Sequence, residues 1–335
     1  MSNFAHTIRA EFPKRKVVIV GDLVADQFLH GTISRVSREA PVFILRHDDT
    51  ETLAGGAANA AANVASLGGN AILVGFVGKD SNGEILLEQL TSANVNCDFV
   101  VASPKVKTTT KVRVIAGQTY TPRQQVIRID YENSNAIETD LEETLIKNLF
   151  SACKNADAII ISDYKYGVAS PKIIEAVKQI SIEKNIPLIA DSRFRLKNFQ
   201  GATSATPNQE EVEEILGKNF TEDDCVKLCQ DFGFKSLLVT CGNKGMLLIE
   251  NGKTPLKLEA IGAKEPVDVT GAGDTVIATY TLGLASGMSF AESAKLANHA
   301  GGIVVMKKGT AAVGVDELIS SLSKNEIIEQ KARTQ

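Results

Sequence analysis

The stretch VDVTGAGDTV, residues 267–276, decides the fold and the chemistry that we expect of this chain. Gly271 and Gly273 can adopt backbone conformations that other residues avoid, and they leave neighbouring N–H groups uncovered. The apolar run that follows, residues 275–284, is compatible with a helix. A helix that begins near Asp274 points its free N–H groups and its positive dipole end at one place. The stretch therefore predicts an anion site suited to a transferring phosphoryl group.

Asp274 has two interpretations within this anion site. Its carboxylate can cap the helix, because Asp is a favoured N-cap residue that accepts hydrogen bonds from unpaired N–H groups. It can instead be a general base that takes the proton of a substrate hydroxyl while the N–H groups hold the phosphate. The local sequence leaves both open, and the rest of the chain favours the base.

The composition is that of an ordinary globular protein. The chain has 335 residues, of which 44% are hydrophobic and 23% are charged. The net charge of −4 offers no basic surface for nucleic acid or anionic lipid. Residues 1–16 lack the apolar core of a signal peptide, and no apolar run has the length of a membrane span. We expect a cytoplasmic protein that binds neither nucleic acid nor membrane.

The cysteines do not form a metal site. None of the five has C-x-x-C spacing, and the four histidines are scattered. Cys225 and Cys229 lie four residues apart on an expected helix, and together they supply only two ligands. We therefore expect reduced thiols.

Alternating strands and helices predict a parallel sheet that is covered on both faces. A β-branched run at residues 16–20 reads as a buried strand that ends in a tight turn at Gly21 and Asp22. The regular alternation continues with a helix at 140–152, a strand at 158–163, a helix at 171–184, and strands at 187–191 and 236–240. Extended segments that do not alternate with helices predict a small antiparallel sheet beside the main domain, at residues 42–45, 108–115 and 124–129.

Two further motifs each have a structural and a functional interpretation. The diglycine Gly55-Gly56 and the amide of Asn59 suit a sugar, because the backbone is open and the amide can donate and accept. The same motif also fits a close contact between helix and sheet. Asn208 and Glu211 share a helix face, where they can form a capping pair or lie beside a metal-bound nucleotide.

The two glycine motifs together resemble the signatures of the ribokinase-like (PfkB) sugar kinases. D-x-T-G-A-G-D at 268–274 is similar to the C-terminal signature, and G-G-x-x-N at 55–59 is similar to the N-terminal one. The resemblance covers nearly the whole chain. It implies a three-layer α/β/α fold with a mostly parallel central sheet and a small β-sheet lid, formed by segments 27–50 and 105–130. We expect one domain over residues 1–335, a frayed tail at 324–335, and a homodimer that forms through the lid.

The resemblance also implies roles for individual residues. Asp274 is the base, and Gly271, Ala272 and Gly273 form the anion hole. Glu211 acts on Mg²⁺ through water, and Asp268 and Thr270 lie near a monovalent cation such as K⁺. The residues expected to bind ATP are Asn208, Gln209, Glu210, Glu211, Thr240, Gly242, Gly245 and Asn298. The residues expected to hold the sugar are Asp26, Gly55, Gly56 and Asn59.

Finer matches resemble the branch that phosphorylates the anomeric 1-hydroxyl of D-glycero-β-D-manno-heptose 7-phosphate. Among them are S-R-V-S at 34–37, T-K-V-R at 110–113 and I-R-I-D at 127–130. Within these 335 residues we expect the kinase alone. A phosphorylated sugar needs cations, and the lid offers Arg35, Arg113, Arg38, Lys111, Arg123 and Arg128. A solvated, charged lid is the alternative for each of them.

Three rival classes remain to be weighed. A dinucleotide-dependent dehydrogenase shares the βαβ pattern, but G-D-L-V-A-D at 21–26 stands where a G-x-G-x-x-G would follow the first strand. A Walker-type NTPase needs G-x-x-x-x-G-K-[ST], which the sequence lacks. A catalytically silent sugar or nucleotide sensor is harder to exclude, although pure binding does not need Asp274.

Overall fold

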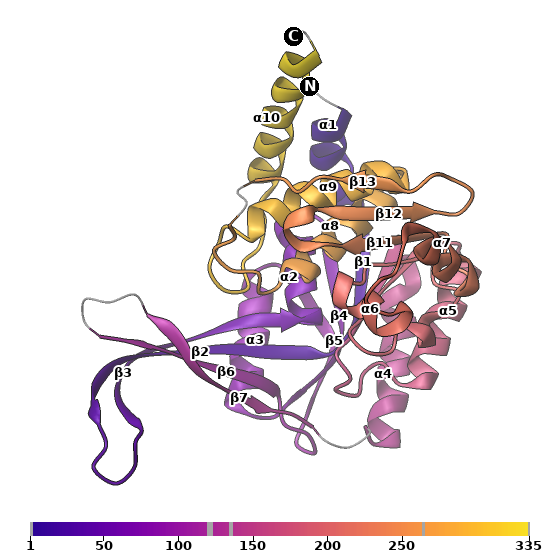
Figure 1. Cartoon of the computed structure of the whole chain (residues 1–335). Helices are drawn as coiled ribbons and strands as arrows, with labels where there is room; N and C mark the ends of the chain where they lie inside the picture. Colours follow the sequence, from indigo (N-terminus) through magenta and orange to yellow (C-terminus); the bar gives the residue numbers. More distant parts are fainter. Residues whose placement is uncertain (1–2, 119–122, 134–136, 263–264, 334–335) are drawn as a thin grey trace.

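The computed structural model describes residues 3–118, 123–133, 137–262 and 265–333 (Figure 1). Within these residues, the body is built on a nine-stranded sheet in the order β13-β12-β11-β10-β9-β8-β1-β4-β5. Seven of the described strands pair in parallel, and β12 and β13 add to one edge in antiparallel pairings. The strands are β1 Lys16–Gly21, β4 Asn70–Gly78, β5 Asn96–Ser103, β8 Ala158–Asp163, β9 Leu188–Ser192, β10 Ser204–Ala205, β11 Ser236–Thr240, β12 Met246–Glu250 and β13 Leu256–Leu258.

The strands bury both faces, as the sequence pattern predicts. In β1, Val17 and Ile19 pack into one hydrophobic core, and Val18 and Val20 pack into the other. Because successive side chains of a strand point to opposite faces, a fully apolar strand needs helices on both sides. The architecture is therefore the expected three-layer α/β/α arrangement.

The helices divide between the two faces of the sheet. One core contains side chains of α1 Asn3–Ala10, α2 Ala57–Ser66, α3 Ser81–Ser92, α8 Ala272–Ala285, α9 Phe290–Val304 and α10 Val315–Arg333. The other contains side chains of α4 Thr139–Ala152, α5 Pro171–Lys184, α6 Gln209–Leu216 and α7 Glu222–Asp231. Short 3-10 turns are η1 Phe12–Lys14, η2 Cys153–Asn155, η3 Leu196–Phe199 and η4 Gly242–Lys244.

A second sheet projects from the body as a lid (Figure 1). Its order is β3-β2-β6-β7, with bounds β2 Leu23–Val36, β3 Phe43–Gly56, β6 Thr109–Gly117 and β7 Gln124–Tyr131. The outer pairings are antiparallel as expected, but β2 and β6 run parallel, so the sheet is mixed. The parallel pairing arises because a long crossover through α2, β4, α3 and β5 separates β3 from β6.

The junction between the first two strands differs from the sequence expectation. The tight turn expected at Gly21 and Asp22 is wrong, because the chain passes from β1 straight into the lid strand β2. Most of the segment expected to fray, 324–335, belongs to α10, which is helical to Arg333. Among the described residues, no helix is both long enough and apolar enough to cross a membrane.

Candidate active site

A cavity of about 800 Å³ lies where the carboxyl ends of the parallel strands face the lid. Ligands of open α/β sheets bind at this edge, where strand ends and the following loops meet. Both the lid and the body line it. The lid contributes Asp26, Lys111, Arg113 and Arg128, and the body contributes Asp163, Tyr164, Asp191, Arg193, Asn208, Glu211, Thr240 and the segment 269–274.

The start of α8 builds the floor of this cavity. Gly271 is the N-cap in a left-handed conformation with a φ of 76°, and the helix begins at Ala272. Asp274 therefore lies inside the first turn, and the interpretation of Asp274 as the cap is wrong. A Cβ on Gly271 would lie 2.4 Å from Asn59 Nδ2, whereas a Cβ on Gly273 would meet nothing within 4 Å. Gly271 is thus required by packing, and Gly273 keeps the cavity open.

The backbone N–H groups of this segment are only partly free. The N–H of Ala272 donates to the carbonyl of Val269 at 3.2 Å. Among the described residues, the N–H groups of Gly271 and Gly273 have no such partner. Together with the positive end of the α8 dipole, these two groups give the cavity a place for an anion.

Asp274 is buried, and each oxygen of its carboxyl group accepts one hydrogen bond. Asn59 Nδ2 donates to its Oδ2 at 2.8 Å, and the hydroxyl of Tyr164 donates to its Oδ1 at 3.1 Å. Burial, together with the charge of Asp191, raises the pKa of Asp274 to about 7, although both hydrogen bonds oppose the rise. A carboxylate that changes protonation near neutral pH is suited to take a proton from a substrate hydroxyl.

Asn59 does not line the cavity, although we expected it to hold a sugar. It is buried, with its amide nitrogen on Asp274 and its Oδ1 accepting from Asn63 Nδ2 at 3.1 Å. Asn63 in turn accepts from the hydroxyl of Thr275 at 3.0 Å. This chain of hydrogen bonds ties α2 to α8, so Asn59 supports the carboxylate of Asp274.

The lid brings a buried ion pair to the cavity. Asp26 comes from β2, and Arg113 Nη2 lies 2.6 Å from its Oδ1. Burial raises the pKa of Asp26, and the neighbouring Arg113 and Lys111 oppose this rise. Gly55 leaves room for the Asp26 carboxylate, because a Cβ there would lie 2.4 Å from its Oδ2. Gly56 lines the cavity itself.

Three of the six lid cations lie in the cavity. Lys111 is buried, and among the described residues its ammonium makes no hydrogen bond or ion pair. Arg128 lines the cavity and holds Asp130 with two hydrogen bonds, at 2.8 and 2.6 Å. Arg113 is the third. The cations that do not line it are Arg35 and Arg38, which are exposed, and Arg123, which pairs with Asp48 at 2.8 Å.

The side expected to bind nucleotide begins at α6. Asn208 and Glu211 form the capping box, with each side chain accepting from the other's backbone N–H at 2.9 Å. The capping interpretation is therefore confirmed, and both residues also line the cavity together with Gln209 and Glu210. Burial raises the pKa of Glu211 to about 7.

A smaller cavity of about 180 Å³ continues from the large one. It contains the other expected nucleotide residues, Thr240, Gly242, Gly245 and Asn298, and its remaining walls are mainly apolar or glycine. Asn298 Nδ2 is held by the carbonyl of Glu259 at 2.7 Å. Gly245 allows β13 to approach closely, because a Cβ at this position would lie 1.9 Å from the carbonyl oxygen of Leu258. Its small volume and mainly apolar lining suit a flat ring.

Asp268 joins two loops. It accepts the N–H of Thr270 at 2.9 Å and the N–H of Gly309 at 2.9 Å. Burial alone raises its pKa, but these hydrogen bonds outweigh burial and hold the pKa of Asp268 below its ordinary value. Among the described residues, no three acidic, histidine or cysteine side chains gather in a metal-binding cluster.

Sequence reasoning missed four side chains that line the cavity, namely Asp163, Tyr164, Asp191 and Arg193. All four lie at or just beyond the ends of β8 and β9. Burial, then the charge of Glu211, raises the pKa of Asp191 to about 7. The signal was available, because both strands were expected and ligand sites lie beyond the carboxyl ends of such strands.

Comparison with known proteins places the chain in a family. The profile of the pfkB family carbohydrate kinases matches residues 14–317. The bifunctional protein HldE of Vibrio parahaemolyticus is 38% identical over 97% of this chain and 68% of its own length. HldE of Haemophilus influenzae (strain PittEE) is 40% identical over 93% of this chain and 64% of its own length. The chain thus spans about two thirds of the length of these relatives.

Solved structures share the fold. Arabidopsis thaliana ribokinase complexed with ribose and ATP has a TM-score of 0.70 at 24% identity, covering 92% of this chain and 98% of that one. Phosphofructokinase-2 from Escherichia coli in complex with substrates and products has a TM-score of 0.74 at 20% identity, covering 92% of this chain and 99% of that one. The chain therefore belongs to the pfkB family of carbohydrate kinases, and it is an ATP-using sugar kinase with a ribokinase-like fold.

Proposed function

We propose that this kinase transfers the γ-phosphoryl group of Mg²⁺·ATP to the anomeric 1-hydroxyl of D-glycero-β-D-manno-heptose 7-phosphate. The observation that supports it best is the position of Asp274, a carboxylate with a pKa of about 7 between the cationic lid and the anion site of α8. The resemblance of the lid motifs to the heptose kinase branch supports the acceptor. The product would feed ADP-heptose and lipopolysaccharide core synthesis in the cytoplasm, where ATP is available.

Asp274 accepts the proton of the 1-hydroxyl in this mechanism. The oxygen then attacks the γ-phosphorus, the bond from phosphorus to the β-bridging oxygen breaks, and ADP leaves. The N–H groups of Gly271 and Gly273 stabilise the charge of the phosphoryl oxygens. The N–H of Ala272 joins them only if its hydrogen bond to Val269 is given up. Positioning and electrostatics thus supply most of the rate.

Glu211 fits the role expected of a residue that holds Mg²⁺ through water. Glu211 and Asp191 both line the cavity, and the negative charge of Glu211 raises the pKa of Asp191. A divalent cation between the two carboxylates would relieve this repulsion. Mg²⁺ keeps several waters and needs few carboxylates, which agrees with the lack of a dense acidic cluster among the described residues. When bound, Mg²⁺ neutralises charge on the phosphates. Arg193, an exposed guanidinium that lines the same wall, is assigned to the nucleotide phosphates.

The sugar lies between the lid and Asp274 in this proposal. Asp26 and the backbone at Gly56 contact sugar hydroxyls, and the Arg113 ion pair holds Asp26 in place. Lys111 and Arg128 bind the 7-phosphate, since Lys111 is a buried cation without a bonded anionic partner among the described residues. A monovalent cation near Asp268 and Thr270 stays a prediction, which replacement of K⁺ by tetramethylammonium would test.

A homodimer through the lid is part of the proposal. Large apolar side chains are exposed on the edge strands of the lid, namely Phe43 on β3 and Val126, Ile127, Ile129 and Tyr131 on β7. Exposed apolar edge strands are surfaces that proteins commonly cover by association. Light scattering of wild type and of Ile127→Glu measures this, with a dimer expected only for the wild type.

The deciding experiment is ADP release from Mg²⁺·ATP with a panel of acceptors. We expect strong preference for D-glycero-β-D-manno-heptose 7-phosphate over fructose 6-phosphate and ribose. Preference for another sugar would keep the kinase mechanism and remove the heptose assignment. Folded protein that binds ATP but releases no ADP with any acceptor would support a catalytically silent sensor.

A further inference from the structure

Tyr164 contacts the proposed base, although it belongs to neither signature. Its hydroxyl donates to Oδ1 of Asp274, while Asn59 donates to Oδ2. The two donors come from different elements, Tyr164 from the loop between β8 and α5 and Asn59 from α2. Each carboxylate oxygen thus has one fixed donor, which leaves the remaining lone pairs of the carboxylate for the acceptor hydroxyl.

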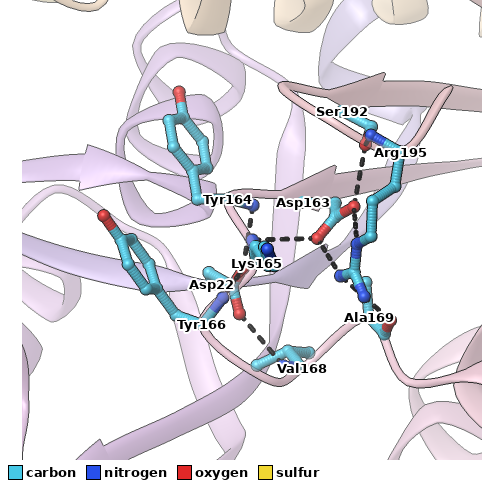
Figure 2. A network of polar contacts seen from close by, with 9 residues as sticks. All are labelled: Asp22, Asp163, Tyr164, Lys165, Tyr166, Val168, Ala169, Ser192 and Arg195. Carbon is cyan, nitrogen blue, oxygen red and sulfur yellow. Dashed lines mark hydrogen bonds and ion pairs between the residues drawn. The ribbon is translucent and has the colours of Figure 1, made fainter. Parts of the chain in front are cut away.

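A buried network holds the loop that carries Tyr164 (Figure 2). The carboxylate of Asp22 accepts the backbone N–H groups of Tyr164 at 2.8 Å, Tyr166 at 3.0 Å and Val168 at 3.0 Å. Asp163 accepts the N–H of Lys165 at 3.0 Å, and Lys165 has a left-handed φ of 68°. The backbone N–H groups of Tyr164 and of the residues that follow it are therefore held by the carboxyl groups of Asp22 and Asp163.

The same network continues away from the cavity. Asp163 also accepts from the hydroxyl of Ser192 at 2.8 Å and forms an ion pair with Arg195, whose Nε lies 3.1 Å away. Figure 2 shows the Tyr164 side chain directed away from Asp163, Ser192 and Arg195. These three residues therefore support the loop without contacting the tyrosine ring. Such a scaffold sets the position of the tyrosine hydroxyl through the backbone.

Two cations fix the ring of Tyr164. Lys111 Nζ lies 5.3 Å from the ring centroid, and Arg193 Cζ lies 5.5 Å from it. Attraction of cations by the ring faces restrains the side chain further. Burial, with the charge of Asp274, raises the pKa of Tyr164 well above its ordinary value, so the hydroxyl keeps its proton and remains a donor.

We propose that Tyr164 is a positioning residue for the base: its hydroxyl orients the carboxylate of Asp274 and stabilises the ionised form that accepts the proton. This inference rests on the proposed role of Asp274. The other groups that act on Asp274 are known: Asn59 stabilises the charge by a hydrogen bond, and the like charges of Asp191 and Asp26 oppose it. Tyr164 is thus one of two neutral donors that counter two carboxylates.

Tyr164→Phe tests the proposal, with Tyr166→Phe as the matched control. Both tyrosines lie in one loop and contact Lys111, but the hydroxyl of Tyr166 donates to Glu132. Two readouts are needed: kcat/KM against pH with Mg²⁺·ATP and the heptose 7-phosphate, and a ¹³C NMR titration of the Asp274 carboxyl. In Tyr164→Phe, we expect both midpoints to move to higher pH by roughly 0.5–1 pH unit, since a hydrogen bond to the ionised form is lost. In Tyr166→Phe we expect both midpoints to stay at their wild-type values.

The outcomes separate this inference from the proposed function. Near-normal turnover of Asp274→Asn would remove the base and this inference with it. If Asp274→Asn is inactive but neither midpoint moves in Tyr164→Phe, the role of Tyr164 is overturned alone. A Tyr164→Phe rate that falls equally at every pH, with an unchanged NMR titration, also overturns it, because a merely structural residue behaves in that way.

Discussion

Asn59 Nδ2 donates a 2.8 Å hydrogen bond to Asp274 Oδ2 across 215 positions of sequence. This bond joins the two glycine motifs that identify the family, because Asn59 ends the N-terminal one and Asp274 ends the C-terminal one. Gly271 is tied to the same point, since only a residue without a Cβ leaves room for the Asn59 amide. The two motifs thus pack together and hold the buried carboxylate of Asp274 at the start of α8.

Replacing Asp274 by Asn removes the proposed base with little change of volume. We expect kcat to fall by roughly 10²-fold or more, the lower range for loss of a general base. ADP release measures the effect. Calorimetry of ATP binding and thermal unfolding serve as controls, and both should stay near wild type. Substantial turnover in this variant would contradict the assignment.

The pH profile of the wild type follows from the environment of the same carboxyl. Only the ionised form accepts a proton, so kcat/KM should fall about tenfold per pH unit below the pKa of the base. Burial raises the pKa of Asp274 to about 7, and the acidic limb should therefore lie near pH 7. Initial rates from pH 5 to 9 at constant ionic strength measure it. A kcat/KM that does not fall between pH 7 and pH 5 would contradict a pKa of about 7 for the base.

Substitution of Gly271 and Gly273 by Ala should separate stability from activity. Gly271→Ala places a Cβ at a φ of 76° and 2.4 Å from Asn59 Nδ2, and we expect a loss of roughly 1–3 kcal/mol of unfolding free energy. Gly273→Ala meets no atom within 4 Å and gains helix propensity, so stability should hold or rise by up to about 1 kcal/mol.

Gly273→Ala should lose activity without losing stability. The new methyl group of Gly273→Ala enters the anion site, so ATP affinity and kcat should both fall although the protein is stable. Denaturant unfolding, calorimetry of ATP binding and ADP release measure the three quantities. A Gly273→Ala enzyme that binds and turns over ATP normally would show that phosphate does not approach this backbone.

The sequence predicted the layers and the motifs better than it predicted the contacts between them. Strands such as residues 158–163 and 236–240 were predictable because they are apolar on both faces, which parallel strands need. The long strand β2 was not, because its polar and apolar residues do not alternate with the period of two that would predict a strand. Asn59 was assigned to the sugar because local sequence cannot show that α8 packs beside α2. Tyr164 was missed since it follows a strand without any motif around it.

Asp191→Asn should stabilise the protein at alkaline pH. Burial and the charge of Glu211 raise the folded-state pKa of Asp191 to about 7, against about 3.9 in an unfolded chain. Ionisation therefore costs the folded state stability as the pH rises from about 4 through about 7. We expect the variant to gain about 1–2 kcal/mol over wild type at pH 8, less than the full shift because Asp191 is only partly enclosed.

The dependence of this stability gain on pH tests whether the charge of Asp191 causes it. At pH 4 the wild-type carboxyl is neutral when folded, so the gain should nearly vanish there. Urea unfolding at pH 4 and at pH 8 gives both values, and Asp98→Asn at an exposed site is the matched control. An equal gain at both pH values would point to packing and not to charge.

Lys111→Gln and Arg35→Gln distinguish the cation in the cavity from the cation outside it. Lys111 is buried in the cavity wall without a bonded anion among the described residues, while Arg35 is exposed near the far end of β2. A charge-assisted hydrogen bond to phosphate is worth about 1.5–3 kcal/mol, so Lys111→Gln should raise KM for the heptose 7-phosphate by roughly 10- to 100-fold. Unphosphorylated heptose should show little difference between wild type and variant. Arg35→Gln should leave KM within about twofold, in line with the small effect of exposed charges. The reverse result, a large effect at Arg35 and none at Lys111, would move the phosphate site from this cavity to the outer lid.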